Sequence, residues 1–354
     1  MSSARGDRLV AVLEERGLDS LLVTDLTNLR WLTGFTGTNG AAVVTRERRL
    51  FLTDFRYTEQ AEAQVSGFER LPAGRDLVGD MAPHLSGRAG FDDVHVSVRT
   101  HAKLREKVAG DTELHAAGGA VEGLREIKDR EELERIAASQ ELASAALERI
   151  LEQGLVGRTE RGVALALEQE MREAGATGPS FPSIVAAGPH GALPHAVPRD
   201  QEIPRGVLCV IDWGAELDGY CSDCTRTVAT GPLDDEATEA YELARQAQQV
   251  GLEAVRSGAG CAAVDGAARQ VIADAGQGER FGHSLGHGVG LEVHEGPTLS
   301  QRSEGTLRTG NVVSVEPGVY VPGRFGIRIE DLVAVTDQGA DVLTRLGKEL
   351  VAVD

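Results

Sequence analysis

The chain has 354 residues, of which 41% are hydrophobic and 26% are charged, as in ordinary globular proteins. With 36 basic and 55 acidic side chains its formal net charge is −19, which disfavours nucleic acid and anionic membranes as partners. It contains no apolar run long enough to span a bilayer, and its first residues lack the apolar core of a signal peptide.

Residues 1–124 alternate helical and strand patterns. The spacing in RLVAVLEERGLD is helical, whereas SLLVT, GAAVVT and RRLFLTD are typical of strands. We therefore predict an α/β domain with a mixed sheet in this part of the chain. Its histidines are scattered, so we interpret them as surface or packing residues: His84, His95, His101 and His115.

A break in the pattern near residues 120–128 predicts the start of a second domain, residues 125–354. Asp129 and Glu132 form a capping-box pattern at the start of a long helix that Gly154 can end. A second helix is predicted at about 160–174. The Gly/Pro-rich segment SFPSIVAAGPHGALPHAVPRD follows it and leads into a pair of apolar strands.

The same order recurs further along the chain. Helices are predicted at about 235–257 and 262–275, followed by the Gly/His-rich segment GERFGHSLGHGVGLEVHEGP and a second pair of strands. Each half thus has two helices, a histidine-bearing loop and a hairpin. This internal repeat predicts a site at the junction of two pseudo-symmetric halves.

Both predicted hairpins carry two acids on apolar strands. If the first turn centres between Leu217 and Asp218, Asp212 faces Asp223 across the ladder. In the second hairpin, a turn at Pro322-Gly323-Arg324 places Glu316 opposite Glu330. Opposed carboxylates repel each other and lose hydration near a core, and a cation between them removes both penalties.

The four acids therefore predict a metal site, with at least one histidine as a further ligand. Five of the nine histidines lie in the two loops: His190, His195, His283, His287 and His294. An imidazole beside four carboxylates favours Mn²⁺, Co²⁺ or Fe²⁺ over a structural zinc site with thiolates. Four acids are too many for one catalytic ion, whereas two ions that share carboxylates would use all of them.

Two other motifs are weaker. Cys221 and Cys224 form C-x-x-C inside a strand, with no second pair, and we interpret the four cysteines as reduced core thiols of a cytosolic protein. GHSLG fits a nucleophile elbow around Ser284, but the following GHGVG is a poor helix and the required order of acid and histidine is absent.

Several motifs together resemble the metallopeptidases of the pita-bread fold, in the branch of aminopeptidase P and Xaa-Pro dipeptidase (prolidase). They are IDWGAELDGYCSDCTRT, HSLGHGVGLEVHE, VEPGVY, GIRIED and SIVAAGPHGALPHA, and NLRWLTGFTGTNGAAVV resembles the creatinase-like N-terminal domain of the same proteins. The resemblance covers nearly the whole chain. It implies an α/β (α+β) protein: a mixed-sheet domain followed by a pita-bread domain with a pseudo-two-fold repeat of helices and antiparallel hairpins.

The resemblance also implies roles for individual residues. Two metal ions, most simply Mn²⁺ with Co²⁺, Fe²⁺ and Zn²⁺ as alternatives, would be bound by Asp212, Asp223, His287, Glu316 and Glu330. A metal-bridging hydroxide would attack the carbonyl of an Xaa-Pro bond, with Glu316 as proton shuttle. The remaining implied catalytic or substrate-binding residues are His195, His283, His294 and Arg328. Thr225 is implied to orient Asp223.

From this resemblance we predict a cytoplasmic homodimer that acts on proline-containing peptides as an aminopeptidase or a dipeptidase. Three rival classes share the fold: a methionine-type aminopeptidase, a metal-free creatinase-like hydrolase and a non-catalytic binding protein. The long N-terminal domain argues against the first. The complete set of five ligand-type residues argues against the other two.

Overall fold

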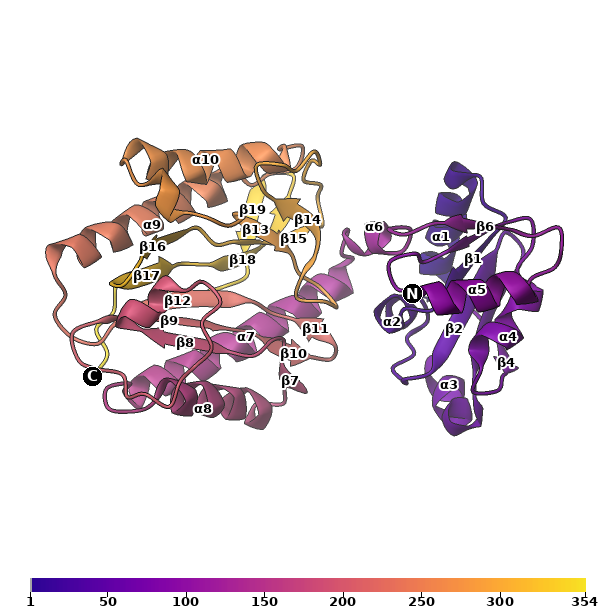
Figure 1. Cartoon of the computed structure of the whole chain (residues 1–354), viewed down its shortest axis with the longest axis horizontal. Coiled ribbons are helices and arrows are strands. Elements are labelled where there is room, and N and C mark those ends of the chain that lie inside the picture. The colour runs from indigo at the N-terminus through magenta and orange to yellow at the C-terminus, as the bar shows by residue number, and fades with distance from the viewer. Residues whose placement is uncertain (1) are drawn as a thin grey trace. The chain divides into compact units, whose positions relative to one another are not determined.

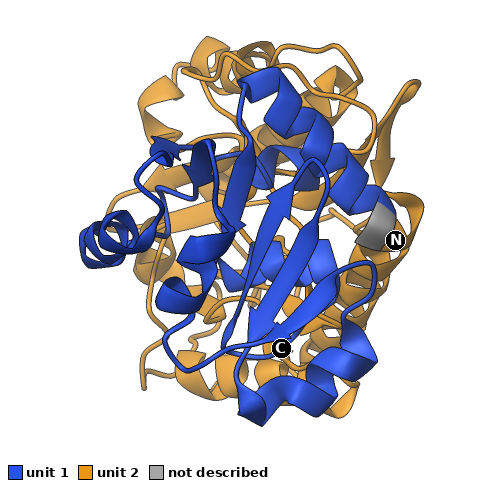
Figure 2. Ribbon diagram, turned by 90° about the vertical axis from the view of Figure 1, so that its right-hand side faces the viewer, with its two compact units in different colours: residues 1–125 blue, residues 126–354 orange. Residues whose placement is uncertain are grey.

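The computed structural model describes residues 2–354, and the chain divides into two compact units, Met1–Arg125 and Glu126–Asp354 (Figure 2). The first unit contains a six-stranded sheet in the order β4-β3-β2-β1-β5-β6. Strand β1 pairs antiparallel with β2 and parallel with β5, and β5 pairs parallel with β6. The predicted mixed sheet is confirmed.

The elements of the first unit agree closely with the patterns in the sequence. Its strands are β1 (Ser20–Val23), β2 (Gly40–Thr45), β3 (Arg49–Thr53), β4 (Glu69–Pro72), β5 (Arg88–Phe91) and β6 (Glu113–Ala116). Its helices are α1 (Ser2–Arg16), α2 (Leu26–Thr33), α3 (Thr58–Gln64), α4 (Leu77–Met81), α5 (Val98–Lys107) and α6 (Glu122–Arg125), with short 3₁₀ helices η1 (Phe55–Tyr57) and η2 (Ala82–His84). Leu22, Val43 and Leu52 lie in its buried core.

The second unit begins with two helix pairs separated by strands. Its helices are α7 (Arg130–Glu152), α8 (Glu160–Glu173), α9 (Asp235–Ala254) and α10 (Cys261–Asp274), with 3₁₀ helices η3 (Gly188–Ala192) and η4 (Gly278–Arg280). Its strands are β7 (Gly178–Pro179), β8 (Ile184–Ala187), β9 (Leu208–Trp213), β10 (Ala215–Leu217), β11 (Tyr220–Cys221), β12 (Cys224–Ala229), β13 (Gly286–Gly288), β14 (Glu295–Leu299), β15 (Val312–Val315), β16 (Gly318–Val321), β17 (Phe325–Arg328), β18 (Asp331–Thr336) and β19 (Gly339–Val342).

Helix α7 begins and ends as its sequence predicts. The Asp129 side chain accepts from the backbone N–H of Glu132, and the Glu132 side chain accepts in return from the backbone N–H of Asp129. Gly154, at φ +80°, occupies the left-handed position just past the end of the helix, where glycine is favoured.

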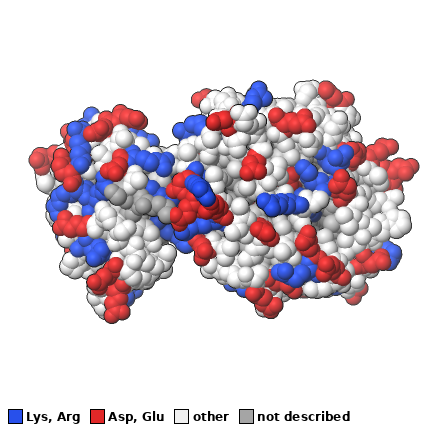
Figure 3. Space-filling model, turned by 180° about the vertical axis from the view of Figure 1, so that it is seen from behind, with Lys and Arg blue, Asp and Glu red and all other residues white. Residues whose placement is uncertain are grey.

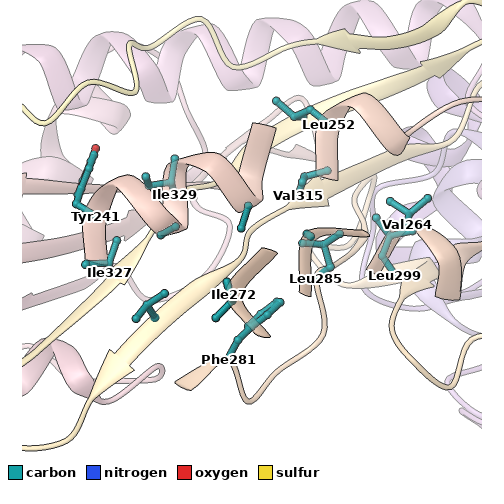
Figure 4. Packing of buried hydrophobic residues seen from close by; sticks show 14 of the residues in the cluster. Tyr241, Leu252, Val264, Ile272, Phe281, Leu285, Leu299, Val315, Ile327 and Ile329 are labelled. Atoms are coloured by element: carbon teal, nitrogen blue, oxygen red, sulfur yellow. The ribbon is translucent and has the colours of Figure 1, made fainter. Parts of the chain in front are cut away.

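The strands of the second unit lie between the two helix pairs, with α7 and α8 on one side and α9 and α10 on the other (Figure 1). One core cluster joins α7 and α8 to β8, β9 and β12, and a second joins α9 and α10 to β15, β16 and β17. Figure 4 shows the second cluster, in which Tyr241 comes from α9, Ile272 from α10 and Ile327 from β17. The predicted repeat of two helices, loop and hairpin is confirmed.

The predicted register of the first hairpin is wrong by two residues. Asp212 pairs with Thr225 rather than with Asp223, and Leu217 pairs with Tyr220. The turn is therefore Asp218-Gly219, with φ values of +49° and +80°. Both central residues of a type I′ turn need positive φ, and Asp-Gly meets that need. Because the shift is an even number of residues, the faces of the strands are preserved.

The predicted register of the second hairpin is confirmed. Val315 pairs with Asp331, and Val321 pairs with Phe325 across a three-residue turn. This register places Glu316 and Glu330 at matching positions between the paired segments.

Charged side chains of both signs are interspersed on the face shown in Figure 3, so this face has no continuous basic surface. Among residues 2–354, no helix combines the length and the hydropathy that crossing a bilayer requires. All four cysteines of the described chain are buried and free.

Candidate metal centre

The nine residues expected to bind metal, to act in catalysis or to contact the substrate all line one cavity of about 730 Å³ in the second unit. They are His195, Asp212, Asp223, His283, His287, His294, Glu316, Arg328 and Glu330. Apolar side chains, among them Phe181, Ile184 and Val197, line another part of its wall. The cavity therefore combines a dense group of ionisable side chains with an apolar surface.

His287 lies on β13 between two glycines, each so close to a neighbouring backbone that an added Cβ atom would clash with it. A Cβ atom on Gly286 would lie 1.9 Å from the Ser314 carbonyl oxygen, and one on Gly288 would lie 2.1 Å from that of Gly296. β13 therefore needs both glycines to pair with β14 and β15 at once. The neighbouring Leu285 is fully buried in the second core cluster and anchors the segment.

The His287 ring is directed at two of the acids. Its Nε2 atom lies 3.3 Å from Oε1 of Glu316 and 3.5 Å from Oδ2 of Asp223. Its Nδ1 atom lies 3.1 Å from the backbone oxygen of Gly288. Nδ1–H can therefore donate to that oxygen and leave the Nε2 lone pair free for a metal ion, which is the tautomer that a ligand needs.

Asp212, Asp223 and Glu330 are buried together, with relative exposures of 9%, 5% and 1%. One ligand atom each from Asp223, His287 and Glu330 lies within 4.8 Å of the others. Among residues 2–354, Oδ1 of Asp212 and Oε1 of Glu330 are buried without a hydrogen-bond partner. Buried carboxylate oxygens without donors are costly, and a bound cation removes that cost.

The electrostatics of the cluster show that the charges of Asp223 and Glu330 are only partly compensated by nearby cations. Burial and the Glu330 carboxylate raise the pKa of Asp223 well above its usual range. Burial and the Glu316 charge do the same to the pKa of Glu330. Burial also raises the pKa of Glu316, but hydrogen bonding and the charge of His287 outweigh it and lower that pKa to about 2.

Arg328 and Thr225 hold the acids in place. Arg328 donates from Nη2 to Oδ2 of Asp212 (2.6 Å) and from Nε to Oγ1 of Thr225 (3.0 Å). Thr225 in turn donates to Oε2 of Glu330 at 2.8 Å. The expectation that Thr225 orients Asp223 is therefore wrong, because its hydroxyl bonds to the acid of the other hairpin.

The three remaining histidines lie around this group. His283 contacts the hydroxyl of Tyr320 through Nε2 (3.0 Å), and burial lowers its pKa. The His294 ring lies 4.3 Å from that of His287, centroid to centroid, and burial and His287 lower its pKa. His195 and His294 are exposed, so their ring nitrogens are accessible to a molecule in the cavity.

Two residues of the site were missed in the sequence. Tyr320 accepts from Nη1 of Arg328 at 2.9 Å and so links that residue to His283. Ser314 donates to Oε1 of Glu316 at 3.0 Å and accepts from the backbone N–H of His287. Both are polar residues on otherwise apolar strands, and this pattern could have marked them as candidates. Their hydrogen bonds with His283 and His287 could not be predicted, because those residues lie in a distant segment of the chain.

His190, which the sequence placed in the same loop as His195, lies elsewhere. Its Nδ1 atom is 2.9 Å from Oε2 of Glu160, which also accepts from Arg199. His190 therefore belongs to a group of side chains around the buried Glu160 at the start of α8.

The chain belongs to metallopeptidase family M24, whose model matches residues 134–337, and the creatinase/prolidase N-terminal domain matches residues 5–127. Among curated relatives, the Xaa-Pro dipeptidase of Pyrococcus furiosus is 34% identical over 352 residues, which cover 98% of this chain and 99% of the relative. An uncharacterized peptidase of Bacillus subtilis, YqhT, is 41% identical over 349 residues, covering 98% and 99%.

Solved structures show the same relationship. An Xaa-Pro dipeptidase from Bacillus anthracis has a TM-score of 0.97 and 37% identity, with complete coverage of both chains. An X-Pro aminopeptidase from Thermotoga maritima has a TM-score of 0.90 and 35% identity, covering 99% of this chain and all of that one. The predicted fold class, a creatinase-like domain with a pita-bread domain, is confirmed, as is the assignment to the metallopeptidases.

Proposed function

We propose that this protein hydrolyses the peptide bond that precedes proline, as an Xaa-Pro dipeptidase or an Xaa-Pro aminopeptidase. The observation that carries the proposal is the gathering of four carboxylates and one imidazole in a single cavity, with two buried carboxylate oxygens left without donors. Relatives of nearly equal length named as Xaa-Pro dipeptidases support the choice of bond.

The residues present fit two divalent ions. Asp212, Asp223, His287, Glu316 and Glu330 would bind them, and four ionised carboxylates would balance the four positive charges of the pair. Because oxygen donors predominate, we propose Mn²⁺, with Co²⁺, Fe²⁺ and Zn²⁺ as alternatives. When bound, the ions supply an activated water at neutral pH and polarise the carbonyl that it attacks.

The protein's own side chains perform the remaining steps. As the resemblance implies, Glu316 would take the proton of the attacking water on its ionised carboxylate and deliver it to the leaving proline nitrogen. His294 is neutral at that pH because its pKa is lowered, and one ring N–H can donate to the oxyanion. His195, on the same cavity, assists in this role.

Substrate binding uses the rest of the cavity. The apolar wall at Phe181, Ile184 and Val197 suits a proline ring, which has no N–H to satisfy. His283 and Arg328 are fixed through Tyr320 and complete the polar wall that faces the substrate. Arg328 would therefore both face the substrate and orient Asp212, to which it donates a hydrogen bond.

Domain roles, assembly and location complete the proposal. Residues 1–124 would form a creatinase-like domain and residues 125–354 the catalytic domain. A homodimer follows from the resemblance to the family, and light scattering of the purified chain tests it. The four free thiols favour the cytoplasm, where thiols stay reduced.

A cleavage panel tests the reaction. The Mn²⁺-loaded protein is given an Xaa-Pro dipeptide, an Xaa-Pro-Yaa tripeptide, a longer Xaa-Pro peptide and a Met-Ala peptide, each with and without chelator. Turnover of the dipeptide alone identifies a dipeptidase, and turnover of the longer peptides alone an aminopeptidase. Cleavage of Met-Ala alone, or activity that survives complete metal removal, would overturn the proposal.

A further inference from the structure

Three neighbouring parallel strands of the first unit each lead to an acid. Strands β1, β5 and β6 are adjacent and run parallel, so their carboxyl ends meet at one edge of the sheet. Asp25 follows β1, Asp92 follows β5 directly, and Glu122 begins the helix α6 after β6. The carboxyl edge of a parallel sheet is where ligands most often bind.

His95 lies among these three acids and faces them with both ring nitrogens. Its Nδ1 atom is 3.5 Å from Oδ2 of Asp25. Its Nε2 atom is 4.0 Å from Oδ2 of Asp92 and 3.9 Å from Oε1 of Glu122. One ligand atom each from Asp92, His95 and Glu122 lies within 4.8 Å of the others.

Asp92 provides an independent reason to place a ligand here. Its side chain is only 9% exposed, and within residues 2–354 its Oδ2 atom has no hydrogen-bond partner, although Oδ1 accepts from the N–H of Val94. The 4.0 Å separation from His95 is too long for a hydrogen bond. A buried carboxylate oxygen without a donor is costly, and this one is directed at an imidazole nitrogen and a second carboxylate.

We propose that Asp92, His95 and Glu122 bind a divalent transition-metal ion through Oδ2, Nε2 and a carboxylate oxygen. Asp25 then accepts from Nδ1–H of His95, which is how carboxylates commonly orient a metal-bound histidine. Ligand atoms around a tetrahedral zinc ion lie about 3.4 Å apart. The three ligand atoms here lie within 4.8 Å of one another, so they must draw together on binding the ion. One imidazole and two carboxylates accept Zn²⁺ or Mn²⁺.

The site is accessible and would have a structural role. His95 lines a cavity of about 400 Å³ beside Thr24 and Asn39, which gives an ion a path of entry. A bound ion would tie the ends of β5 and α6 together, and through Asp25 it would also restrain α2, whose first turn that residue caps. The proposal is independent of the reaction catalysed in the second unit.

Counting bound ions tests this site. The full-length protein is stripped with chelator, equilibrated with Zn²⁺ or Mn²⁺ alone, and assayed by mass spectrometry of the metal and by calorimetry. Asp92→Asn and His95→Gln should each lose one ion per chain, or weaken its Kd more than about 100-fold, and Asp25→Asn should weaken it about 10- to 100-fold. Asp93→Asn is the matched control, because it makes the same change in the neighbouring, exposed residue. This variant should bind the ion with the wild-type Kd.

Two further comparisons make the result decisive. Glu330→Gln should lose ions bound in the second unit and keep the ion of the first, so failure at one centre is distinguished from failure at the other. If Asp92→Asn does not fold, His95→Gln decides, because that side chain is 37% exposed. An unchanged number of ions and an unchanged Kd in His95→Gln would overturn the proposal.

Discussion

Arg328 donates a hydrogen bond of 2.6 Å from Nη2 to Oδ2 of Asp212, and both side chains are buried. Because Oδ1 of Asp212 has no hydrogen-bond partner within residues 2–354, the contact leaves that oxygen for another ligand. The same guanidinium donates to Thr225, to Tyr320 and to the backbone oxygen of Pro194. Arg328 thus fixes the orientation of one proposed metal ligand from behind.

Arg328→Lys tests that role. Lysine keeps the charge but loses the planar set of donors, so it cannot bond to Asp212, Thr225 and Tyr320 together. We expect the Kd for the catalytic ions to rise about 10- to 100-fold, as is usual when a group that orients a ligand is lost. Calorimetric titration of the chelator-treated protein with Mn²⁺ measures this.

Arg324→Lys is the matched control, because Arg324 lies in the turn between β16 and β17 and is paired with Asp234 on the surface. It should bind Mn²⁺ as the wild type does. Equal affinities in both variants would show that Arg328 does not orient Asp212 for metal binding.

Glu330→Gln should have opposite effects on the metal-free and the metal-loaded protein. Without ions, burial and the charges of Glu316 and Asp212 raise the pKa of Glu330 well above its usual value of 4.5. The folded state then holds a proton that the unfolded state has released. The stability from this group is therefore present below about pH 4.5 and is lost as the pH rises through the folded pKa.

At neutral pH we accordingly expect metal-free Glu330→Gln to be more stable than the wild type, by about 1 kcal/mol or more, with a flatter dependence on pH. With Mn²⁺ the order should reverse, because the variant lacks a ligand. Thermal unfolding with and without chelator between pH 4 and 8 measures both effects. Glu148→Gln, on an exposed position of α7, serves as control, and a metal-free Glu330→Gln protein less stable than wild type would contradict the prediction.

His294→Gln separates catalysis from metal binding. We propose that His294 donates to the oxyanion and does not bind an ion, so the change should lower kcat about 100- to 1,000-fold and leave the number of bound ions unchanged. His84→Gln, in the first unit, should alter neither quantity. Loss of an ion from His294→Gln would instead identify the residue as a ligand.

The features of this centre that could be predicted are those whose residues lie close together in the sequence. The hairpins and their acids followed from residue patterns within about 20 positions, and the second register was correct. The first register failed because the turn was placed one residue early, although Asp218-Gly219 is the pair that a type I′ turn requires. The prediction of which side chains share a face of the sheet was still correct, because the register was shifted by two residues and side chains alternate with a period of two.

Contacts between distant segments could not be predicted in the same way. Thr225 bonds to Glu330, 105 residues away, and Tyr320 joins His283, in the loop before β13, to Arg328 on β17. His95 was interpreted as a surface or packing residue because no acid pattern near it in the sequence indicated a site. Its neighbours in space, Asp25, Asp92 and Glu122, follow three different strands. Only the parallel order of β1, β5 and β6 brings those neighbours together.

Glu160 anchors the loop that carries His195. Its side chain, only 1% exposed, accepts from the backbone N–H groups of Ala187 and Arg199 and from the guanidinium of Arg199. Burial raises the pKa of Glu160, but the hydrogen bonds from Arg199, Ala187 and His190 together outweigh it, so the pKa is lowered from its usual value of 4.5. The resulting stability is present above about pH 4.5 and is lost as the pH falls through the folded pKa.

Glu160→Gln should therefore lose about 3 kcal/mol of unfolding free energy at pH 7, because an amide brings a donor into a site filled with donors. The difference from wild type should shrink as the pH falls below about 4.5, and kcat should fall as His195 loses its fixed position. Glu170→Gln, on the same helix, breaks a half-exposed pair with Arg149 and should cost under about 1 kcal/mol. Denaturant unfolding of the wild type and of both variants at pH 7 and pH 4 measures these differences. Equal losses of unfolding free energy in the two variants would show that Glu160 contributes no more stability than a surface ion pair does.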